Sequence, residues 1–401
     1  MSGDVITLVS TRIYPGDGEP FPGCIRIGGG KIVGVEKMSQ AVRPGNAASC
    51  GEIVLDVGDS IVIPGLIDIH VHGSGGFSAA DGSATLEGMA KVLARSGVTA
   101  FQPALGAAPV DEMERSIEGA YQFASGQGGG AAEMLGIHLE GPFLSRKFPG
   151  AMAEQNLLDP DIPLLSRWVE LARGNIGRVT LAPELPGATE MVEFLVERGI
   201  RASIGHTAAT YDEAVRGFRA GISIVTHTFN AMRGFHHREP GALGAALTEK
   251  GIFLELIADC LHVHPAAMSL MVASCGVDSV VLVSDAMPAA GSPPGEYEFL
   301  GRRVTLGLDG KVTLEDGTLA GSSAFLKDCL RNMVERVGVS FEDALRMATV
   351  NPAKALGVFD RKGTLASGKD ADVVVLSEDY EVLACWTKGV EVKNVFRDGE
   401  A

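Results

Sequence analysis

Between residues 61 and 288 the sequence alternates short apolar stretches with amphipathic ones, and this alternation is what most constrains the fold. Eight stretches predict buried strands: 61–72, 99–105, 133–141, 178–184, 201–207, 223–231, 253–263 and 279–288. Most of the segments between them have helical periodicity, as in TYDEAVRGFRAG. Strands that are apolar along their whole length, each followed by a helix, are typical of parallel sheets. Eight such units predict an α/β fold of the TIM-like (β/α)₈ barrel type.

A doubly wound open sheet is the alternative to the barrel, but no GxGxxG motif follows the first predicted strand. After the eighth strand, RVTLGLDGKVTL (303–314) consists of two alternating runs around an Asp-Gly pair. This pattern predicts a β-hairpin, which we expect to be an insertion over the barrel mouth. Two helices, at 323–338 and 340–357, are expected to complete the barrel.

Both ends of the chain are rich in short β stretches, unlike the middle. The first 60 residues contain several such stretches, separated by turn sequences and by a polar stretch around 39–51. The last 35 residues show the same β-rich pattern as the first 60. We therefore expect one small β-sandwich domain built from residues 1–60 and 364–401. Residues 61–363 would then form the metal-dependent catalytic barrel.

Charge and cysteine content exclude several classes of function. The net charge of −16 disfavours a nucleic-acid partner, although one local cationic pocket could still hold a small anionic ligand. The six cysteines are widely separated and form no CxxC pair, which argues against a zinc ribbon or a redox dithiol. We see neither a signal peptide nor an apolar stretch long enough to span a membrane, so we expect a cytoplasmic protein.

Ionisable side chains gather at the C-terminal ends of the predicted strands. They are His70, His72, Glu140, His206, His227, His262 and Asp285. In a barrel these strand ends open on the face that carries the active site. Residues two apart on a strand point the same way, so His70 and His72 would both face the barrel axis.

Imidazole and carboxylate groups in this arrangement suit a divalent metal such as zinc, iron or manganese. A single histidine at a strand end usually has a structural role, and we expect this of His138. The joint pattern over several strands instead favours a site for one or two ions, with Glu140 able to bridge a pair. Asp285 is then a candidate base beside a metal-bound water. Asp68 and Asp259 would either orient imidazoles or accept hydrogen bonds from the backbone.

Several sequence strings resemble a known family. PGLIDIHVHG (64–73) resembles the first barrel strand of the amidohydrolase superfamily. HLEGPFL, THTFNAM, HHREPG, LVSDAM and DGTLAGSS narrow the resemblance to the N-acetylglucosamine-6-phosphate deacetylases. It extends from about residue 60 to residue 376. It implies hydrolytic removal of the acetyl group from N-acetyl-D-glucosamine 6-phosphate, a step of amino-sugar catabolism.

The resemblance also implies roles for individual residues. Glu140, His206 and His227 match metal ligands, and His70 with His72 matches a pair that holds a second ion in some members. Asp285 matches the catalytic acid/base.

Further matching positions imply contacts with the sugar phosphate, and they are Ala151, Asn230, Ala231, His262, Leu319, Ala320 and Gly321. Arg238 matches an arginine that reaches the phosphate in the neighbouring subunit, which implies a homodimer.

Two positions depart from the family pattern. Cys260 stands where the family usually has glycine, and Met152 stands where many members have a polar residue. Both departures concern the preference for acyl group or sugar more than the type of reaction.

Other functions remain open on the sequence alone. A deacetylase of N-acetylgalactosamine 6-phosphate and a cyclic amide hydrolase are the enzyme alternatives. A non-catalytic sugar-phosphate sensor is the third, and such a protein would be expected to have lost ligands or the acid/base.

Overall fold

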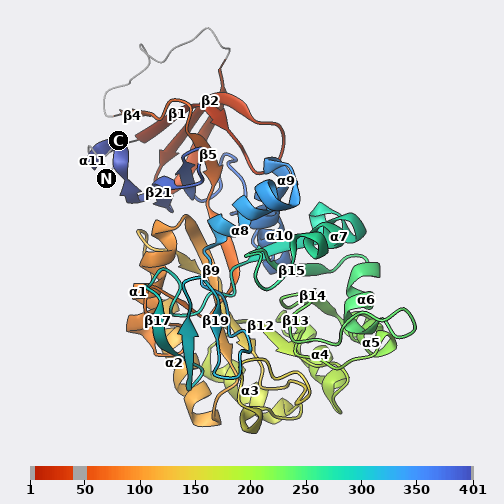
Figure 1. The fold of residues 1–401 in the computed structure, drawn as a ribbon. Helices are drawn as coiled ribbons and strands as arrows, with labels where there is room; N and C mark the ends of the chain where they lie inside the picture. The colour runs from red at the N-terminus through yellow and green to blue at the C-terminus, as the bar shows by residue number, and fades with distance from the viewer. Residues whose placement is uncertain (1–4, 39–51, 399–401) are drawn as a thin grey trace.

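The computed structural model describes residues 5–38 and 52–398 (Figure 1). The polar stretch around 39–51, which includes Cys50, lies outside the described residues, as do residues 1–4. Among the helices that are described, none is both long and apolar enough to cross a membrane.

The middle of the chain forms a barrel of parallel strands. They are β6 (Leu66–Val71), β9 (Val98–Gly106), β11 (Ile137–Glu140), β12 (Ile176–Leu181), β13 (Arg201–Ile204), β14 (Ile222–Val225), β15 (Phe253–Ile257) and β16 (Val280–Val283). Each pairs in parallel with the next, and the short β10 (Glu133–Met134) also pairs with β9. The barrel closes where the backbone N–H of Asp285 donates to the carbonyl of His70 at 2.9 Å. The predicted (β/α)₈ barrel is confirmed.

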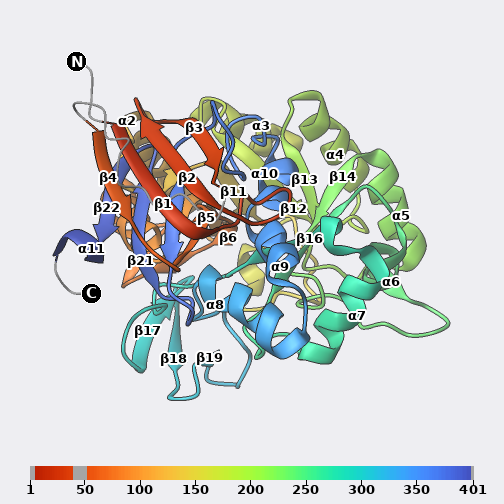
Figure 2. The ribbon, with the colours of Figure 1, turned by 90° about the horizontal axis from the view of Figure 1, so that it is seen from above.

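Helices between the strands cover the outside of the barrel (Figure 2). They are α1 (Ser83–Arg95), α2 (Val110–Gly126), α3 (Ile162–Leu171), α4 (Ala188–Glu197), α5 (Tyr211–Ala220), α6 (Gly241–Thr248) and α7 (Pro265–Cys275). Helix α5 shows how the sequence specifies them, because Thr210 and Glu213 form a capping box and Ala214 faces the core.

The predicted closing helices are also present, as α8 (Leu326–Asn332), α9 (Phe341–Ala348) and α10 (Val350–Leu356). All three contact β6 and β16, which are the two strands at the closure of the barrel.

The barrel strands end earlier than the sequence pattern predicts. His206, His227 and Asp285 were expected on strands, but each lies two residues beyond its strand, after β13, β14 and β16 respectively. Their φ angles are 45°, 28° and 49°, so the backbone is left-handed at all three positions. Such a backbone is strained for residues other than glycine, and it turns the chain out of the strand direction at the barrel mouth.

Strands from both termini form a second sheet with its own apolar core (Figure 1). They are β1 (Val5–Ile13), β2 (Phe21–Gly28), β3 (Lys31–Lys37), β4 (Glu52–Asp56), β5 (Ile61–Pro64), β20 (Val373–Leu376), β21 (Val382–Thr387) and β22 (Val390–Asn394). The short helix α11 (Val395–Asp398) follows. The two termini join where β5 pairs antiparallel with β20. The expectation of a separate β-rich unit made from both ends is confirmed.

The single strand predicted over 61–72 is two strands in two different sheets. The chain changes sheet at Gly65, between β5 in the terminal sheet and β6 in the barrel. A Cβ atom at Gly65 would lie 1.9 Å from the hydroxyl oxygen of Thr99, so no larger residue fits there. The hydrophobic pattern continues across this position, and for that reason it does not reveal the change of sheet.

The predicted hairpin at 303–314 is present and has a third strand. Its antiparallel strands are β17 (Gly295–Phe299), β18 (Arg302–Leu306) and β19 (Val312–Thr313). The ring of Phe299 lies 5.1 Å from the ring of His72, centroid to centroid, so this sheet covers part of the barrel mouth, and we call it the roof. On the barrel side, His72 is followed by the short strands β7 (Gly73–Ser74) and β8 (Phe77–Ser78).

Candidate metal centre

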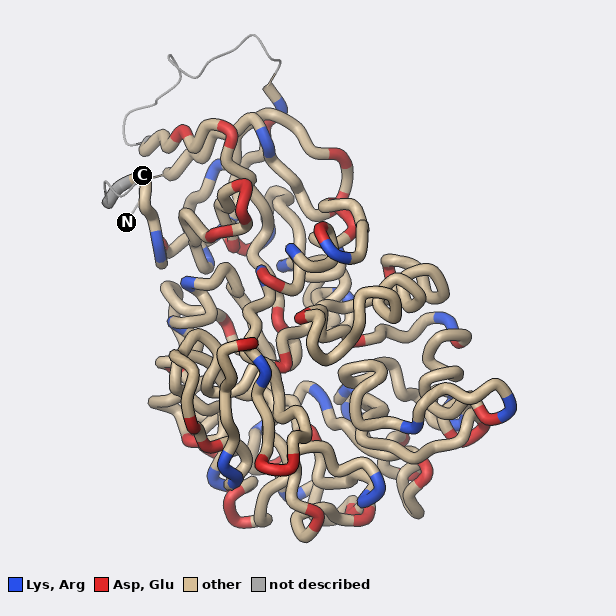
Figure 3. The backbone as a smooth tube through the Cα atoms, viewed as in Figure 1, with Lys and Arg blue, Asp and Glu red and all other residues tan. Residues whose placement is uncertain are grey.

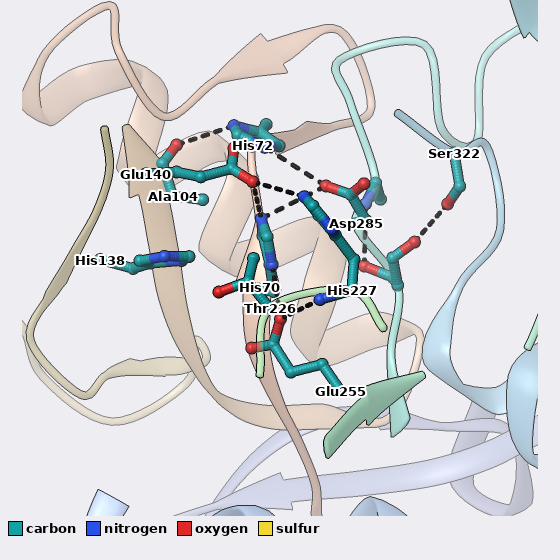
Figure 4. Close-up of polar contacts among 12 residues, drawn as sticks. His70, His72, Ala104, His138, Glu140, Thr226, His227, Glu255, Asp285 and Ser322 are labelled. Atoms are coloured by element: carbon teal, nitrogen blue, oxygen red, sulfur yellow. Dashed lines mark hydrogen bonds and ion pairs between the residues drawn. The ribbon is translucent and has the colours of Figure 1, made fainter. Parts of the chain in front are cut away.

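The five sequence-predicted ligands lie together and buried at the open end of the barrel. Figure 4 shows four of them, His70, His72, Glu140 and His227, around a common centre. Donor atoms of His70, His72 and Glu140 all lie within 4.8 Å of one another, and so do those of Glu140, His206 and His227. Glu140 belongs to both sets. The arrangement therefore has the donors for one divalent cation, or for two that share the Glu140 carboxylate.

The ring nitrogens point toward a common centre. Nε2 of His227 lies 2.9 Å from Oε1 of Glu140 and 3.1 Å from Nε2 of His206. Nε2 of His72 lies 3.1 Å from the other oxygen, Oε2 of Glu140. Two imidazole lone pairs that face each other at this distance repel unless a proton or a cation lies between them. A cation at the centre satisfies both nitrogens at once.

Three of the imidazoles are fixed by hydrogen bonds on their other nitrogen. Nδ1 of His72 lies 3.0 Å from the carbonyl of Ala104, and Nδ1 of His206 lies 2.9 Å from the carbonyl of Phe148. A carbonyl only accepts, so each Nδ1–H donates and each Nε2 keeps its lone pair for the centre. This is how metal-binding histidines are usually oriented.

His70 completes this set. Its Nδ1 lies 2.9 Å from Oε2 of Glu255, while its buried Nε2 has no hydrogen-bond partner among the described residues. Buried polar atoms are rarely left unpaired, so this nitrogen fits a ligand for an ion.

The carboxylates and imidazoles shift one another's pKa. Burial alone would lower the pKa of His70, but the charges of Glu255, Glu140 and Asp285 raise it well above its usual range. Burial would raise the pKa of Glu140, yet the charge of His70 and the hydrogen bonds from His206 and His227 hold it well below the usual range. The centre thus favours positive charge among its carboxylates, as a cation site requires.

Beneath the centre lies a buried ion pair that sequence reasoning missed. Glu255 on β15 accepts from Nδ1 of His70 and, at 3.0 Å, from the backbone N–H of His227. Its other oxygen pairs with Arg178 on β12, and both side chains are fully buried. Glu255 therefore positions two of the candidate ligands. The sequence signal for this ion pair is a charged residue, Arg178 or Glu255, within each of two otherwise apolar strands.

Arg178 also connects this pair to His138. Its Nη2 donates to the carbonyl of Ile69 at 2.6 Å and to Nδ1 of His138 at 2.7 Å. The other ring nitrogen of His138 lies 2.7 Å from the hydroxyl of Thr180. His138 is occupied by protein partners on both sides, in agreement with the expected structural role.

Asp285 faces the centre from beyond β16. Its Oδ1 lies 3.3 Å from Nε2 of His72 and 3.4 Å from Nε2 of His70. Asp68, in contrast, is directed at the backbone: it accepts from the N–H groups of His70 and Ser284, and from the Ser284 hydroxyl at 2.5 Å. Asp68 fixes the strand ends that carry His70 and Asp285.

His262 is held by Asp259. The sequence alone did not decide whether Asp259 orients an imidazole or accepts hydrogen bonds from the backbone. Oδ2 of Asp259 lies 2.7 Å from Nδ1 of His262, and Oδ1 accepts from the backbone N–H of His262. Burial would lower the pKa of His262, but the hydrogen bond and charge of Asp259 raise it. Asp259 thus orients an imidazole that carries positive charge more readily than a free one.

Most residues expected to contact substrate line one cavity of about 470 Å³ above the centre, which we call the site cavity. They are Ala151, Asn230, Ala231, His262, Leu319 and Gly321. Two expected residues do not line it. Ala320 is fully buried and its N–H donates to the carbonyl of Val312, while Arg238 is exposed in the loop before α6.

The two departures from the family pattern lie in different surroundings. Met152 is buried and lines the site cavity. Cys260 is outside the cavity lining, with a φ of 63° that glycine would adopt without strain. Met152 is therefore the departure that faces the site cavity.

Known proteins are similar to this chain in both sequence and fold. A sequence profile of the Amidohydrolase family matches residues 61–401. The chain is 40% identical to an N-acetylglucosamine-6-phosphate deacetylase of Bacillus subtilis, over 82% of this chain and 84% of the relative. It is 36% identical to an N-acetylgalactosamine-6-phosphate deacetylase of Escherichia coli O157:H7, over 91% and 93%.

Among solved structures, the fold is similar to a mutant N-acetyl-D-glucosamine-6-phosphate deacetylase from Mycobacterium smegmatis, in complex with N-acetyl-D-glucosamine-6-phosphate. The TM-score is 0.90 at 31% identity, with 98% of this chain and 100% of that chain covered.

Proposed function

The chain belongs to the amidohydrolase family, and from this premise we propose that it removes the acetyl group from N-acetyl-D-glucosamine 6-phosphate. The products are glucosamine 6-phosphate and acetate, so the reaction is a step of amino-sugar catabolism. One observation carries the chemistry: four imidazole Nε2 atoms and the Glu140 carboxylate converge beside Asp285 at the base of a cavity. The names of the relatives support the substrate.

The donor set fits a divalent cation, because two of its nitrogens face each other and another, Nε2 of His70, is buried without a hydrogen-bond partner among the described residues. We assign Glu140, His206 and His227 to one ion, and His70 and His72, together with Glu140, to a second. Zinc, iron and manganese suit these ligands. A cation bound here would polarise the acyl oxygen and lower the pKa of a coordinated water.

Asp285 is the proposed acid/base. It takes the proton of the attacking water and delivers it to the amine nitrogen as the C–N bond breaks. In support of this role, its Oδ1 lies 3.4 Å from Nε2 of His70 and 3.3 Å from Nε2 of His72, so the carboxylate is adjacent to the proposed ligands. The backbone at Leu319 and Gly321 would line the sugar from the roof side.

The phosphate would lie at the end of the site cavity that carries Asn230, Ala231 and His262. We propose that Arg238 adds a guanidinium from the partner subunit of a homodimer, since it is exposed and does not line its own site cavity. A guanidinium presents a planar fork that matches phosphate oxygens. Phe235, in the same loop, is 60% exposed and offers the apolar contact that an interface needs.

N-acetylgalactosamine 6-phosphate is a second candidate substrate, favoured by the identity to the Escherichia coli relative. The two sugars differ in the configuration of one hydroxyl, which the same phosphate and acyl sites would accept. We also propose that the enzyme works in the cytoplasm. Among the residues that the structure describes, Cys260, Cys275, Cys329 and Cys385 are free thiols, as a reducing compartment favours.

The division into a terminal domain (1–60 and 364–401) and a catalytic barrel (61–363) is part of this proposal. The sheet pairing joins β5 to the terminal strands, so the chain enters the barrel strands after β5, at Gly65.

The test is acetate release from both N-acetylhexosamine 6-phosphates and from the two sugars without phosphate, with metal content measured on the same sample. We expect turnover of a 6-phosphate by metal-containing protein and far weaker turnover of the free sugars. Metal-loaded protein that releases no acetate from either 6-phosphate would contradict the proposal.

A further inference from the structure

A second and larger cavity, of about 1490 Å³, lies next to the site cavity between the roof and the segment that follows β9. We call it the side cavity. The two cavities share part of their lining, including His72, Met152, Phe299 and Leu300. The side cavity therefore meets the site cavity at the candidate metal centre.

The residues proposed to hold the sugar phosphate line only one of the two cavities. Asn230, Ala231 and His262 belong to the site cavity and do not line the side cavity. In an N-acyl amino sugar the alkyl part of the acyl group and the sugar lie on opposite sides of the amide carbonyl. With the carbonyl at the centre and the phosphate toward His262, the alkyl part points toward the side cavity.

The lining of the side cavity changes with distance from the centre. Near His72 it is apolar, with Leu105, Met152, Phe299 and Leu300. Its outer part has exposed charged residues, among them Asp81, Glu112 and Arg115. An apolar region of limited length beside the reacting carbonyl suits a short alkyl chain.

The wall between the cavities is held in place but contains an adaptable side chain. Nη1 of Arg302, on the roof, donates to the carbonyl of Ala151 at 3.3 Å and so ties the roof to the turn that carries Met152. Methionine is unbranched and has three rotatable bonds, so it adjusts to a neighbouring group more readily than other apolar residues.

We propose that the side cavity is an acyl-binding site, and that the enzyme hydrolyses N-propanoyl and N-butanoyl hexosamine 6-phosphates as well as the N-acetyl compound. This inference rests on the proposed function. The reaction balances with water alone: water adds to the acyl carbon, the C–N bond breaks and the amine nitrogen takes the proton. The products are the carboxylate and the same amino-sugar phosphate.

The first experiment measures release of glucosamine 6-phosphate by the metal-loaded wild-type protein from the N-acetyl, N-propanoyl and N-butanoyl substrates. We expect kcat/KM for the N-butanoyl compound to lie within about 10-fold of the N-acetyl value, because an open apolar pocket accepts added methylenes. A fall of more than about 100-fold would overturn the acyl site, since that is the penalty of a closed pocket. Absence of turnover with every acyl group would instead overturn the proposed function.

The second experiment fills the side cavity. Ala108 is partly exposed and lines the side cavity but not the site cavity. Ala108→Phe should lower kcat/KM for the N-butanoyl substrate by about 10-fold or more, and leave the N-acetyl value nearly unchanged. An equal effect on both substrates, or none on either, would contradict the placement of the acyl chain.

The matched control is Ala131→Phe. Ala131 is also partly exposed, and it lines a separate cavity of about 420 Å³ beside α1 that shares no residue with the centre. We expect this variant to hydrolyse all three substrates like the wild type. The wild-type comparison decides the proposal even where a filled variant does not fold.

Discussion

Two clusters of charged side chains in this protein differ in how their charges are balanced. One is the candidate metal centre at the open end. The other lies where the barrel meets the terminal sheet, and we call it the Lys362 cluster; its members are Lys31, Glu133, Arg361, Lys362, Asp370, Asp372 and Lys388. Figure 3 shows that acidic and basic residues are distributed over both the barrel and the terminal sheet.

In the Lys362 cluster each carboxylate meets a lysine or an arginine. Nζ of Lys362 lies 2.5 Å from Oδ2 of Asp372 and 2.7 Å from Oε2 of Glu133. Nη1 of Arg361 lies 2.8 Å from Glu133 and 2.9 Å from Asp370. These cations are permanent at neutral pH, so the cluster is complete without a ligand.

The metal centre is different. Among the residues that the structure describes, no lysine or arginine pairs with Glu140 or Asp285, and their partners are imidazoles. The Nε2 atoms of His206 and His227 also face each other at 3.1 Å. A cluster with its own lysines and arginines is balanced by the protein alone, whereas a cluster whose carboxylates meet only imidazoles is the kind of group that could hold a metal ion.

The largest expected effect is the loss of turnover on removing the Asp285 charge. Asp285→Asn keeps the shape of the side chain but cannot take the water's proton, so kcat should fall by about 10³-fold or more. Bound metal, measured by elemental analysis, should stay at the wild-type level because the five ligands remain. Asp309→Asn on the exposed roof turn is the matched control, and activity retained in Asp285→Asn would remove this residue from the mechanism.

Breaking the Lys362 cluster should affect stability and leave the metal centre unchanged. Lys362→Met leaves the carboxylates of Glu133 and Asp372 without their shared lysine partner. We therefore expect the free energy of unfolding to fall by about 3 kcal/mol. Chemical denaturation measures this, with Lys91→Met on the surface of α1 as a control that should change stability by less than about 1 kcal/mol. A folded Lys362→Met protein that has lost its metal would contradict the separation of the two clusters.

Weakening the support beneath the centre should lower metal affinity without abolishing it. Glu255→Gln removes the charge that holds His70 in place, and the affinity should fall by about 10- to 100-fold. Competition with a chelator measures the affinity on protein shown to be folded. An unchanged affinity would mean that Glu255 serves only the packing of Arg178.

The smallest effect concerns pH. Burial would raise the pKa of Glu133, but Arg361 and Lys362 outweigh it and lower the pKa from 4.5 to about 2. A carboxyl with a lowered folded-state pKa adds stability above pH 4.5 and loses it as the pH falls toward 2. The difference in unfolding free energy between wild type and Glu133→Gln should therefore shrink from pH 6 to pH 3. A constant difference would show that the cluster acts through packing alone.

The barrel could be predicted because its evidence is local, in the alternation of apolar strands and amphipathic helices. The pair His70 and His72 could be predicted for the same reason, since residues two apart on a strand share a face. The strand ends before His206, His227 and Asp285 could not, because their left-handed backbone leaves no mark in the hydrophobic pattern.

Contacts between segments that are distant in the sequence also could not be predicted. The pairing of Glu255 with His70 and Arg178 depends on the arrangement of three strands around the barrel axis, which no single stretch of sequence encodes. The burial of Ala320 beneath the roof is of the same kind.

The central claim is that Glu140, His206 and His227 hold a divalent cation, and elemental analysis of purified variants tests it most directly. We predict at least one ion per chain in the wild type and nearly none in Glu140→Ala and His206→Ala, with circular dichroism showing all three proteins folded. Full metal occupancy in either folded variant would contradict the account.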